Sequence, residues 1–287
     1  MKINKLVDLS KFTTLNIGGI AKNFYQPQSL DQLKDLTKAL DQYYVLGAGS
    51  NLLINDKSEL EHVIYMGDYE KDMLNIDEEG IITVSSSIKV RKLLTFANNQ
   101  GYGGAEYLYS LPAMMGGIVA MNAGRGKNFN KSISDYVISV ELIENGMLKS
   151  VPKKDCGFGY RTSSFLNKNA IIHCIKLKFD EVPVEVGQKR LKQRMKLSIS
   201  KQPLNLPSAG SVFKKCNSKI MKLMKILPKN KSGLYFSEKT PNWISNGGQG
   251  TYEEAMMLIK RARLFHKLLG QSVELEWCIW TNTKLLK

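Results

Sequence analysis

Cysteine and histidine are scarce in this chain of 287 residues, and they are widely spaced. It has four cysteines and three histidines, and no two cysteines are separated by only two residues. Structural zinc sites and disulfide frameworks need such residues in regular, closely spaced sets, so we predict neither, and no metal site. Free cysteines are typical of a reducing compartment, and we expect a cytoplasmic protein.

Long hydrophobic runs are also missing. The first residues, "MKINKLVDLSKFTT", contain no apolar core of the kind that a secretory signal needs. The longest nearly uncharged stretch, residues 107–124, contains Pro112 and a pair of glycines and is short for a membrane span. We interpret it as a buried loop and expect no membrane association.

Acidic residues are absent from residues 188–231, which contain thirteen lysines and arginines, and the whole chain has a formal net charge of +15. Such a run forms a solvated face, a site for a small anion, or a nucleic-acid surface. Phe213 is its only aromatic residue, whereas single-stranded nucleic acid needs several stacking platforms. The composition therefore argues against nucleic acid.

Helices and strands alternate irregularly along the chain, which predicts an α+β fold. Amphipathic or capped patterns predict helices at 29–40, 88–101, within 182–200, at 218–227 and at 251–270. Ser29 is the expected cap of the first, Pro228 the expected end of the fourth, and Thr251 with Glu254 a capping box on the last. Apolar or alternating patterns predict strands within 43–54, 81–87, 136–151, 170–179 and 272–280, with a hairpin turn at Asn145-Gly146 and one shared face for Val273, Leu275 and Trp277. The pattern changes after Phe179, and we place a domain boundary between residues 182 and 183.

Two glycine-containing segments could approach a ligand closely. In "VLGAGSNLL", Gly47 and Gly49 expose backbone amides beside Ser50 and Asn51, which suits a diphosphate. The alternative is a tight turn between two strands, and the spacing is not that of a dinucleotide-binding fingerprint. In "MGGIVAMNAG" the apolar surroundings favour either a flat buried cofactor or a tightly packed core crossing.

Three polar residues are candidates for chemistry. Arg161 in "CGFGYRTSSF" could hold a carboxylate or a developing oxyanion, or form a surface ion pair. Glu276 lies on one face of the alternating "SVELEWCIW", a face that is either solvent or an active site. Ser211 in "LPSAGSVFKK" carries a hydroxyl among small residues, which is typical of a surface turn or of a close backbone approach.

The order of these motifs is more specific than any one of them. From "TTLNIGGIAKNF" almost to the C-terminus, the chain resembles the UDP-N-acetylenolpyruvoylglucosamine reductase (MurB) family. "CGFGYRTSSF" and "QPLNLPSAGSVFK" are the motifs most specific to that family, and "SEKTPNWISN" is similar to its shorter subgroup.

The resemblance implies a fold and a reaction. The expected fold is an FAD-binding domain of the vanillyl-alcohol-oxidase (PCMH) type at 1–182, with subdomains at about 1–56 and 57–182, and an α+β substrate-binding domain at 183–287. The expected reaction reduces the enolpyruvyl ether of UDP-N-acetylenolpyruvoylglucosamine to UDP-N-acetylmuramate, in peptidoglycan precursor synthesis. FAD takes a hydride from NADPH and passes it to the vinyl carbon, and the adjacent enolate carbon is then protonated. We expect a monomer that binds a nucleotide sugar.

The resemblance also implies residue roles. Ser211 is the expected general acid, while Arg161 and Glu276 are expected to stabilise the enolate. The expected FAD contacts are Gly47, Gly49, Ser50, Asn51, Leu52, Pro112, Gly116, Gly117, Asn122 and Gly124. The expected substrate contacts are Tyr160, Lys214 and Lys215.

The chain departs from the family pattern at several of these positions. Ala113 replaces a glycine, and Met114 replaces a hydroxyl residue expected near the FAD phosphates. Lys215 replaces an asparagine that normally contacts the substrate, and Thr240-Pro241 replaces a common His-Ala pair. Three alternatives stay open: another flavoenzyme on the same core, a nucleic-acid-binding protein that uses the basic run, and an inactive relative that binds UDP-sugars.

Overall fold

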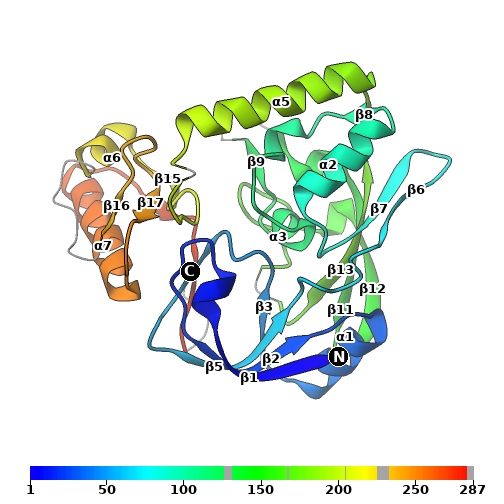
Figure 1. The fold of residues 1–287 in the computed structure, drawn as a ribbon, viewed down its shortest axis with the longest axis horizontal. Helices are drawn as coiled ribbons and strands as arrows, with labels where there is room; N and C mark the ends of the chain where they lie inside the picture. The colour runs from blue at the N-terminus through cyan, green and yellow to red at the C-terminus, as the bar shows by residue number, and fades with distance from the viewer. Residues whose placement is uncertain (126–130, 167, 204, 225–232, 283–287) are drawn as a thin grey trace. The chain divides into compact units, whose positions relative to one another are not determined.

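The computed structural model describes residues 1–125, 131–166, 168–203, 205–224 and 233–282. The chain divides into two compact units, each discontinuous in sequence (Figure 1). Unit 1 consists of Met1–Asn4, Phe24–Ala48 and His62–Leu197, and unit 2 consists of Lys5–Asn23, Gly49–Glu61 and Ser198–Lys287. The boundary that we place after residue 182 stays a prediction. Among the described helices, none has the length and apolarity that crossing a membrane requires.

Unit 1 is built on an antiparallel five-stranded sheet of order β12-β11-β13-β7-β6. Its strands are β6 (Leu74–Ile76), β7 (Ile81–Ser85), β11 (Val137–Glu144), β12 (Met147–Pro152) and β13 (Ile171–Lys178). Asn145 and Gly146 join β11 to β12 with φ angles of 51° and 76°. These left-handed conformations confirm the predicted hairpin turn, because asparagine and glycine tolerate them best.

Three helices of unit 1 pack against this sheet: α1 (Leu30–Ala39), α2 (Val90–Asn99) and α3 (Met115–Ala120). A longer helix, α5 (Val184–Lys201), begins in unit 1 and continues into unit 2 from Ser198. Figure 1 shows α2 and α3 beside β7 and β13, where they share one hydrophobic core, while α1 packs in a second cluster with Ile143 and Ile171. The Ser29 side chain caps α1 by accepting from the Gln32 amide, as predicted.

The segment 107–124 is not a loop throughout, as we expected it to be. It contains α3, and the side chains of Met115, Ile118 and Val119 are buried on that helix. The Gly116 amide donates to the Ser86 carbonyl at 2.8 Å. The sequence pattern missed this helix because its six residues are fewer than two helical turns and include two glycines.

Unit 2 has a core of its own between small sheets and two helices. Its strands are β4 (Leu52–Ile54), β15 (Phe213–Lys215), β16 (Leu234–Phe236), β17 (Ile244–Asn246), β18 (Glu274–Leu275) and β19 (Cys278–Trp280), and its helices are α6 (Ser218–Met224) and α7 (Tyr252–Leu268). The capping box predicted for α7 is present between Thr251 and Glu254. The expected continuation of α6 to residue 227, and its end at Pro228, lie outside the described residues.

The remaining strands form a four-stranded sheet and two short pairs. The sheet has the order β1-β2-β5-β3, from β1 (Lys2–Asp8), β2 (Ile20–Gln26), β3 (Tyr44–Leu46) and β5 (Glu59–Tyr65). The pairs are β8 (Tyr102–Gly103) with β14 (Asp180–Glu181), and β9 (Gly124–Arg125) with β10 (Lys131–Ser132). Short 3-10 helices occupy Leu9–Phe12, Glu106–Leu108, Ile133–Asp135 and Lys153–Asp155.

The C-terminal strand that we expected at 272–280 is two strands. β18 pairs antiparallel with β15, whereas β19 pairs parallel with β4. The chain changes partner at Glu276 and Trp277, between the two strands. Alternation nevertheless predicted the buried face correctly, because Val273, Leu275 and Trp277 all pack in the core of unit 2.

Unit 1 buries His173 in β13, where only 4% of its surface is exposed. Its Nδ1 shares a hydrogen bond with the hydroxyl of Tyr69. Burial lowers the pKa of His173 and Lys34 lowers it further, while Glu141 and Glu70 oppose the shift. The folded protein therefore favours the neutral imidazole.

We predict that unit 1 loses stability as the pH falls below about 6.5, the ordinary pKa of histidine. In that range His173 binds a proton more readily in the unfolded chain than in the folded protein, which favours its neutral form. The free energy of unfolding therefore decreases as the pH decreases. Urea unfolding of the wild type and His173→Gln, at pH 8 and pH 5.5, measures this. The wild type should lose more stability than the variant between the two pH values, and equal losses would contradict the prediction.

Candidate active site

The predicted site residues are distributed over both units. Unit 1 contains Gly47, Pro112, Gly116, Gly117, Asn122, Gly124, Tyr160 and Arg161. Unit 2 contains Gly49, Ser50, Asn51, Leu52, Ser211, Lys214, Lys215 and Glu276.

Some of the predicted cofactor glycines are required by the fold itself. A Cβ on Gly49 would stand 2.1 Å from the Phe12 carbonyl oxygen, and one on Gly124 would stand 2.2 Å from that of Lys131. Gly49 also has a φ of 60°, which favours glycine. At these two positions packing alone accounts for the residue, whether or not a ligand binds.

Other glycines face space that the protein does not fill. A Cβ on Gly117 would meet no atom within 4 Å, and one on Gly47 would meet only the Met114 sulfur at 3.9 Å. The Ser86 hydroxyl, in the turn whose carbonyl accepts from Gly116, is buried and has no hydrogen-bond partner among the described residues. Open backbone and an unsatisfied hydroxyl are what a polar, flat ligand would need here.

Met114 occupies the N-cap position of α3, where its side chain forms no capping hydrogen bond. The methionine is 6% exposed, so its thioether fills space in which a serine or threonine would instead offer a hydroxyl. Ala113 contributes its backbone, since its carbonyl accepts from the Val90 amide at 3.0 Å. Pro112 is exposed.

Asn122 ties the glycine segment to the segment that carries Arg161. Its Nδ2 donates to the Gly159 carbonyl at 2.9 Å, and its Oδ1 accepts from the Ser134 amide at 3.2 Å. The Ser163 hydroxyl also donates to the Ala120 carbonyl, at 2.7 Å. The structure therefore gives the Asn122 amide a role in joining two segments of unit 1.

Arg161 is held in a demanding conformation. Its φ is 54°, in the left-handed region that non-glycine residues rarely adopt. Its guanidinium donates to the Gly124 carbonyl at 2.7 Å and lies 5.3 Å from the centre of the Tyr160 ring. The side chain is thus fixed beside the predicted cofactor segment, and Tyr160 is 43% exposed.

In unit 2, hydrogen bonds hold the segment that contains Ser211 on both sides of that residue. Before it, the Trp277 indole donates to the Ala209 carbonyl at 2.9 Å. After it, the Val212 amide donates to the Asn242 carbonyl at 2.8 Å. Val212 is completely buried, and Ser211 is only half-buried. Ser211 itself forms an isolated antiparallel bridge with Trp243.

Glu276 is connected to this segment through its backbone. Its amide donates to the Val212 carbonyl at 2.8 Å, and its own carbonyl accepts from Asn51 Nδ2 at 3.1 Å. The Cys278 amide donates to the Asn51 carbonyl at 3.0 Å. Unit 2 therefore brings Ser211, Glu276 and Asn51 together. Burial, and then the nearby Glu276 carboxylate, raise the pKa of the half-buried Cys216.

The two predicted substrate lysines share one acidic partner. Lys214 lies 3.6 Å and Lys215 3.8 Å from the carboxylate of Glu274. The Lys215 pair is exposed on both sides and such pairs contribute little stability, so the Lys215 ammonium could exchange this partner for an anionic ligand at small cost. Ser50 is half-buried, and Leu52 begins β4.

Sequence reasoning missed three residues beside the candidate site. Asn242 binds the backbone of the Ser211 segment, and Ser86 lies under Gly116. Arg194 of α5 donates to the Ser110 hydroxyl at 3.1 Å, and burial followed by the charge of Arg125 lowers its pKa. Each of these residues acts on a segment far away in the sequence, so no local motif could have revealed it.

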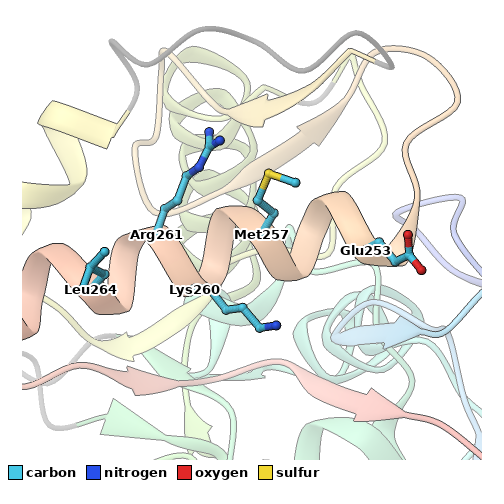
Figure 2. Close-up of a pocket in the computed structure, with 5 residues that line it drawn as sticks. All are labelled: Glu253, Met257, Lys260, Arg261 and Leu264. Atoms are coloured by element: carbon cyan, nitrogen blue, oxygen red, sulfur yellow. The ribbon is translucent and has the colours of Figure 1, made fainter.

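A separate hollow of about 340 Å³ lies along α7. Figure 2 shows its five lining residues on that one helix: Glu253, Met257, Lys260, Arg261 and Leu264. None of them belongs to the predicted site. Met257 and Leu264 are about half exposed, at 44% and 52%.

Comparison with protein families matches residues 21–147 to a profile described as "FAD binding domain". The reductase named UDP-N-acetylenolpyruvoylglucosamine reductase of Thermotoga petrophila is 30% identical over 282 residues, which cover 96% of this chain and 97% of that protein. The protein of the same name in Pelagibacter ubique is 31% identical, over 92% of this chain and 89% of its own length.

A solved structure gives the same result. The crystal structure of UDP-N-acetylenolpyruvylglucosamine reductase (MurB) from Thermus caldophilus matches with a TM-score of 0.81 and 27% identity. The match covers 98% of this chain and 99% of the other. The predicted α+β fold with an FAD-binding core is therefore confirmed.

We predict that Gly117→Ala separates cofactor binding from folding. Alanine is favoured over glycine in a helix by about 1 kcal/mol, and no described atom obstructs a methyl group there. The FAD-free protein should therefore be slightly more stable, while FAD affinity should fall about tenfold because the methyl group occupies space left for the ligand. Thermal unfolding and flavin fluorescence titration measure the two effects.

Gly124→Ala is the matched control, because its Cβ would overlap backbone of the protein itself. It should destabilise the FAD-free protein. Unchanged FAD affinity in Gly117→Ala would show that the cofactor does not approach this glycine.

Proposed function

Because the chain belongs to the UDP-N-acetylenolpyruvoylglucosamine reductase family, we propose that it reduces the enolpyruvyl ether of that nucleotide sugar to UDP-N-acetylmuramate, with NADPH as the reductant. In this role it serves peptidoglycan precursor synthesis. The chain is an FAD-dependent oxidoreductase of this family. The use of NADPH, the identity of the proton donor and the role in peptidoglycan synthesis are proposals.

The residues of unit 1 fit the flavin. The backbone at Gly47 and Gly117 can be approached by a ligand without obstruction. The buried Ser86 hydroxyl, which has no partner among the described residues, could donate a hydrogen bond to it. When bound, FAD supplies a hydride acceptor for NADPH and a hydride donor for the vinyl carbon of the substrate. The remaining chemistry, which is protonation and charge stabilisation, belongs to side chains of the protein.

Ser211 is proposed to donate a proton from its Oγ. Addition of a hydride to the vinyl carbon leaves negative charge on the adjacent carbon and its carboxylate, and that carbon must receive a proton. A serine hydroxyl is a weak acid, but the enolate is a strong base, and a fixed position can supply the advantage that acidity does not. The alkoxide left on Ser211 would then regain its proton from solvent or through Glu276.

Arg161 and Glu276 are proposed to stabilise the enolate. The Arg161 guanidinium donates to the Gly124 carbonyl, which holds it beside the cofactor segment, and its planar set of N–H groups suits a carboxylate. Glu276 would act in its protonated form, as a hydrogen-bond donor or a proton relay. Lys214 and Lys215, already paired with Glu274, would meet the diphosphate or carboxylate of the substrate.

The observation that supports this assignment best is the hydrogen bond from the Glu276 amide to the Val212 carbonyl. Val212 directly follows Ser211, so this bond makes Ser211 and Glu276 neighbours in unit 2. The family resemblance names these two residues separately, and they are distant in sequence. An ordinary surface turn at Ser211 and a solvent-facing glutamate would not need this connection.

The test is an anaerobic spectrum of the FAD-loaded protein, with NADPH added first and the enolpyruvyl substrate second. The flavin bands should bleach and then return. Bleaching without return would exclude this substrate and favour another flavoenzyme. Failure to bind flavin would instead favour a nucleic-acid-binding protein that uses the basic run at residues 188–231. Salt-sensitive nucleic-acid binding would then be measured.

We predict that Ser211→Ala abolishes the second step only. The rate of flavin reduction by NADPH should stay within about twofold of the wild type, while reoxidation by the substrate should slow by about a hundredfold or more, the range of general acid catalysis. Stopped-flow absorbance measures both rates.

Ser208→Ala is the matched control, because it removes a hydroxyl from the same segment. That hydroxyl donates to the Ile244 carbonyl at 2.8 Å, so its loss should cost about 1 kcal/mol of stability and leave both rates near those of the wild type. Equal losses of both half-reactions in Ser211→Ala would instead indicate a structural role for Ser211.

A further inference from the structure

Asn242 holds three backbone groups immediately after Ser211. Its side-chain Oδ1 accepts from the Phe213 amide at 3.1 Å, and its Nδ2 donates to the Phe213 carbonyl at 2.7 Å. Its own carbonyl accepts from the Val212 amide at 2.8 Å. The asparagine side chain thus pairs with Phe213 as a neighbouring strand would, through one donor and one acceptor.

The turn that contains Asn242 does not need this side chain. The Trp243 amide donates to the Thr240 carbonyl at 2.9 Å, and the Thr240 amide donates to the Ser237 hydroxyl at 3.4 Å. The hydrogen bonds that close the turn therefore come from other groups. Both polar atoms of the Asn242 amide act on the Ser211 segment instead.

The segment before Ser211 is anchored as well. The Pro207 carbonyl accepts from the Asn246 amide at 2.9 Å, and the Ala209 carbonyl accepts from the Trp277 indole. Gly210, with a φ of 73° and no atom within 4 Å of its Cβ position, lies between the anchors. Gly210 and Ser211 therefore form a short span whose path is set by its two ends.

We propose that Asn242 is a positioning residue for Ser211. By fixing Val212 and Phe213, it sets the direction in which the backbone presents the Ser211 hydroxyl to the substrate. This inference rests on the proposed role of Ser211 as proton donor. A displacement of about 1 Å at a reacting group can reduce a rate by about a hundredfold, so small movements at Phe213 would be sufficient to affect the reaction.

The test compares Asn242→Ala with Asn246→Ala. The Asn246 side-chain amide likewise binds backbone groups of unit 2, but outside the Ser211 segment, namely the Leu15 carbonyl and the Gly248 and Gly250 amides. The two variants should therefore lose similar stability. Only Asn242→Ala should slow reoxidation by the substrate, by about ten- to a hundredfold, with flavin reduction by NADPH unchanged. An equal slowing in both variants would overturn the proposal.

Hydrogen exchange of the FAD-free protein gives a readout that does not depend on activity. The Phe213 amide, which donates to the Asn242 side chain, should exchange faster in Asn242→Ala and should keep its wild-type rate in Asn246→Ala. A wild-type exchange rate at this amide in Asn242→Ala would contradict the proposed anchoring.

Asn242→Asp tests the donated hydrogen bond. An ionised aspartate still accepts from the Phe213 amide, but its second oxygen faces the Phe213 carbonyl without a proton to share. Protonation restores a donor, so the reoxidation rate of this variant, relative to wild type, should rise as the pH falls. A flat ratio across pH would mean that the Nδ2 hydrogen bond does not position Ser211.

A double-mutant comparison separates this inference from the proposed function. If Asn242 acts through Ser211, Asn242→Ala should have no further effect on reoxidation in the Ser211→Ala background. An undiminished further loss would overturn the inference and leave the role of Ser211 intact. Normal reoxidation in Ser211→Ala alone would instead overturn the proposed function.

Discussion

The hydrogen bond between the Glu276 amide and the Val212 carbonyl is the interaction on which the candidate site of unit 2 depends. It lies where the chain leaves β15 as a partner and turns to β4, and it joins the backbone of the C-terminal segment to that of the Ser211 segment. The next residue, Trp277, continues the connection through its indole to the Ala209 carbonyl. The Asn51 amide fixes Glu276 from the other side. Both proposed proton-handling side chains are thus presented by one hydrogen-bonded framework.

The parts of the fold that could be predicted from sequence are those whose cause is local. The Ser29 cap, the Thr251–Glu254 capping box and the Asn145-Gly146 turn each depend on residues within four positions of one another. The division of the last strand could not be predicted, because it depends on Asn51, which is 225 positions away from Glu276. Asn242 was missed for the same reason, since 29 positions separate it from Phe213.

The candidate site shows the same limit at its glycines. Gly49, Gly117 and Gly124 are identical residues in the sequence, and the family resemblance assigns all three to FAD binding. Their surroundings differ, because a Cβ on Gly49 or Gly124 would overlap backbone of the same unit, whereas a Cβ on Gly117 would meet open space. A glycine without a packing reason in an exposed helix costs stability relative to alanine. Gly117 is therefore the one of the three for which ligand binding is the better explanation.

At two positions where the chain departs from the family pattern, the backbone of the residue makes a hydrogen bond that holds the segment in place. Ala113 contributes a carbonyl to Val90, and Thr240 contributes one to the Trp243 amide; any residue type supplies that group. The Thr240 hydroxyl adds a bond of its own, to the Lys201 carbonyl at 2.8 Å. The turn before Asn242 therefore forms with Thr240 and Pro241 in place of the usual pair, and the Asn242 amide still reaches Phe213. Lys215 is exposed and keeps an anionic partner in Glu274. Met114 is the exception, because its buried side chain itself occupies the place of the expected hydroxyl. The hydrogen bonds that fix Ser211 thus form in this chain despite these departures, as expected if placement of that hydroxyl, more than its acidity, is what the proposed reaction requires.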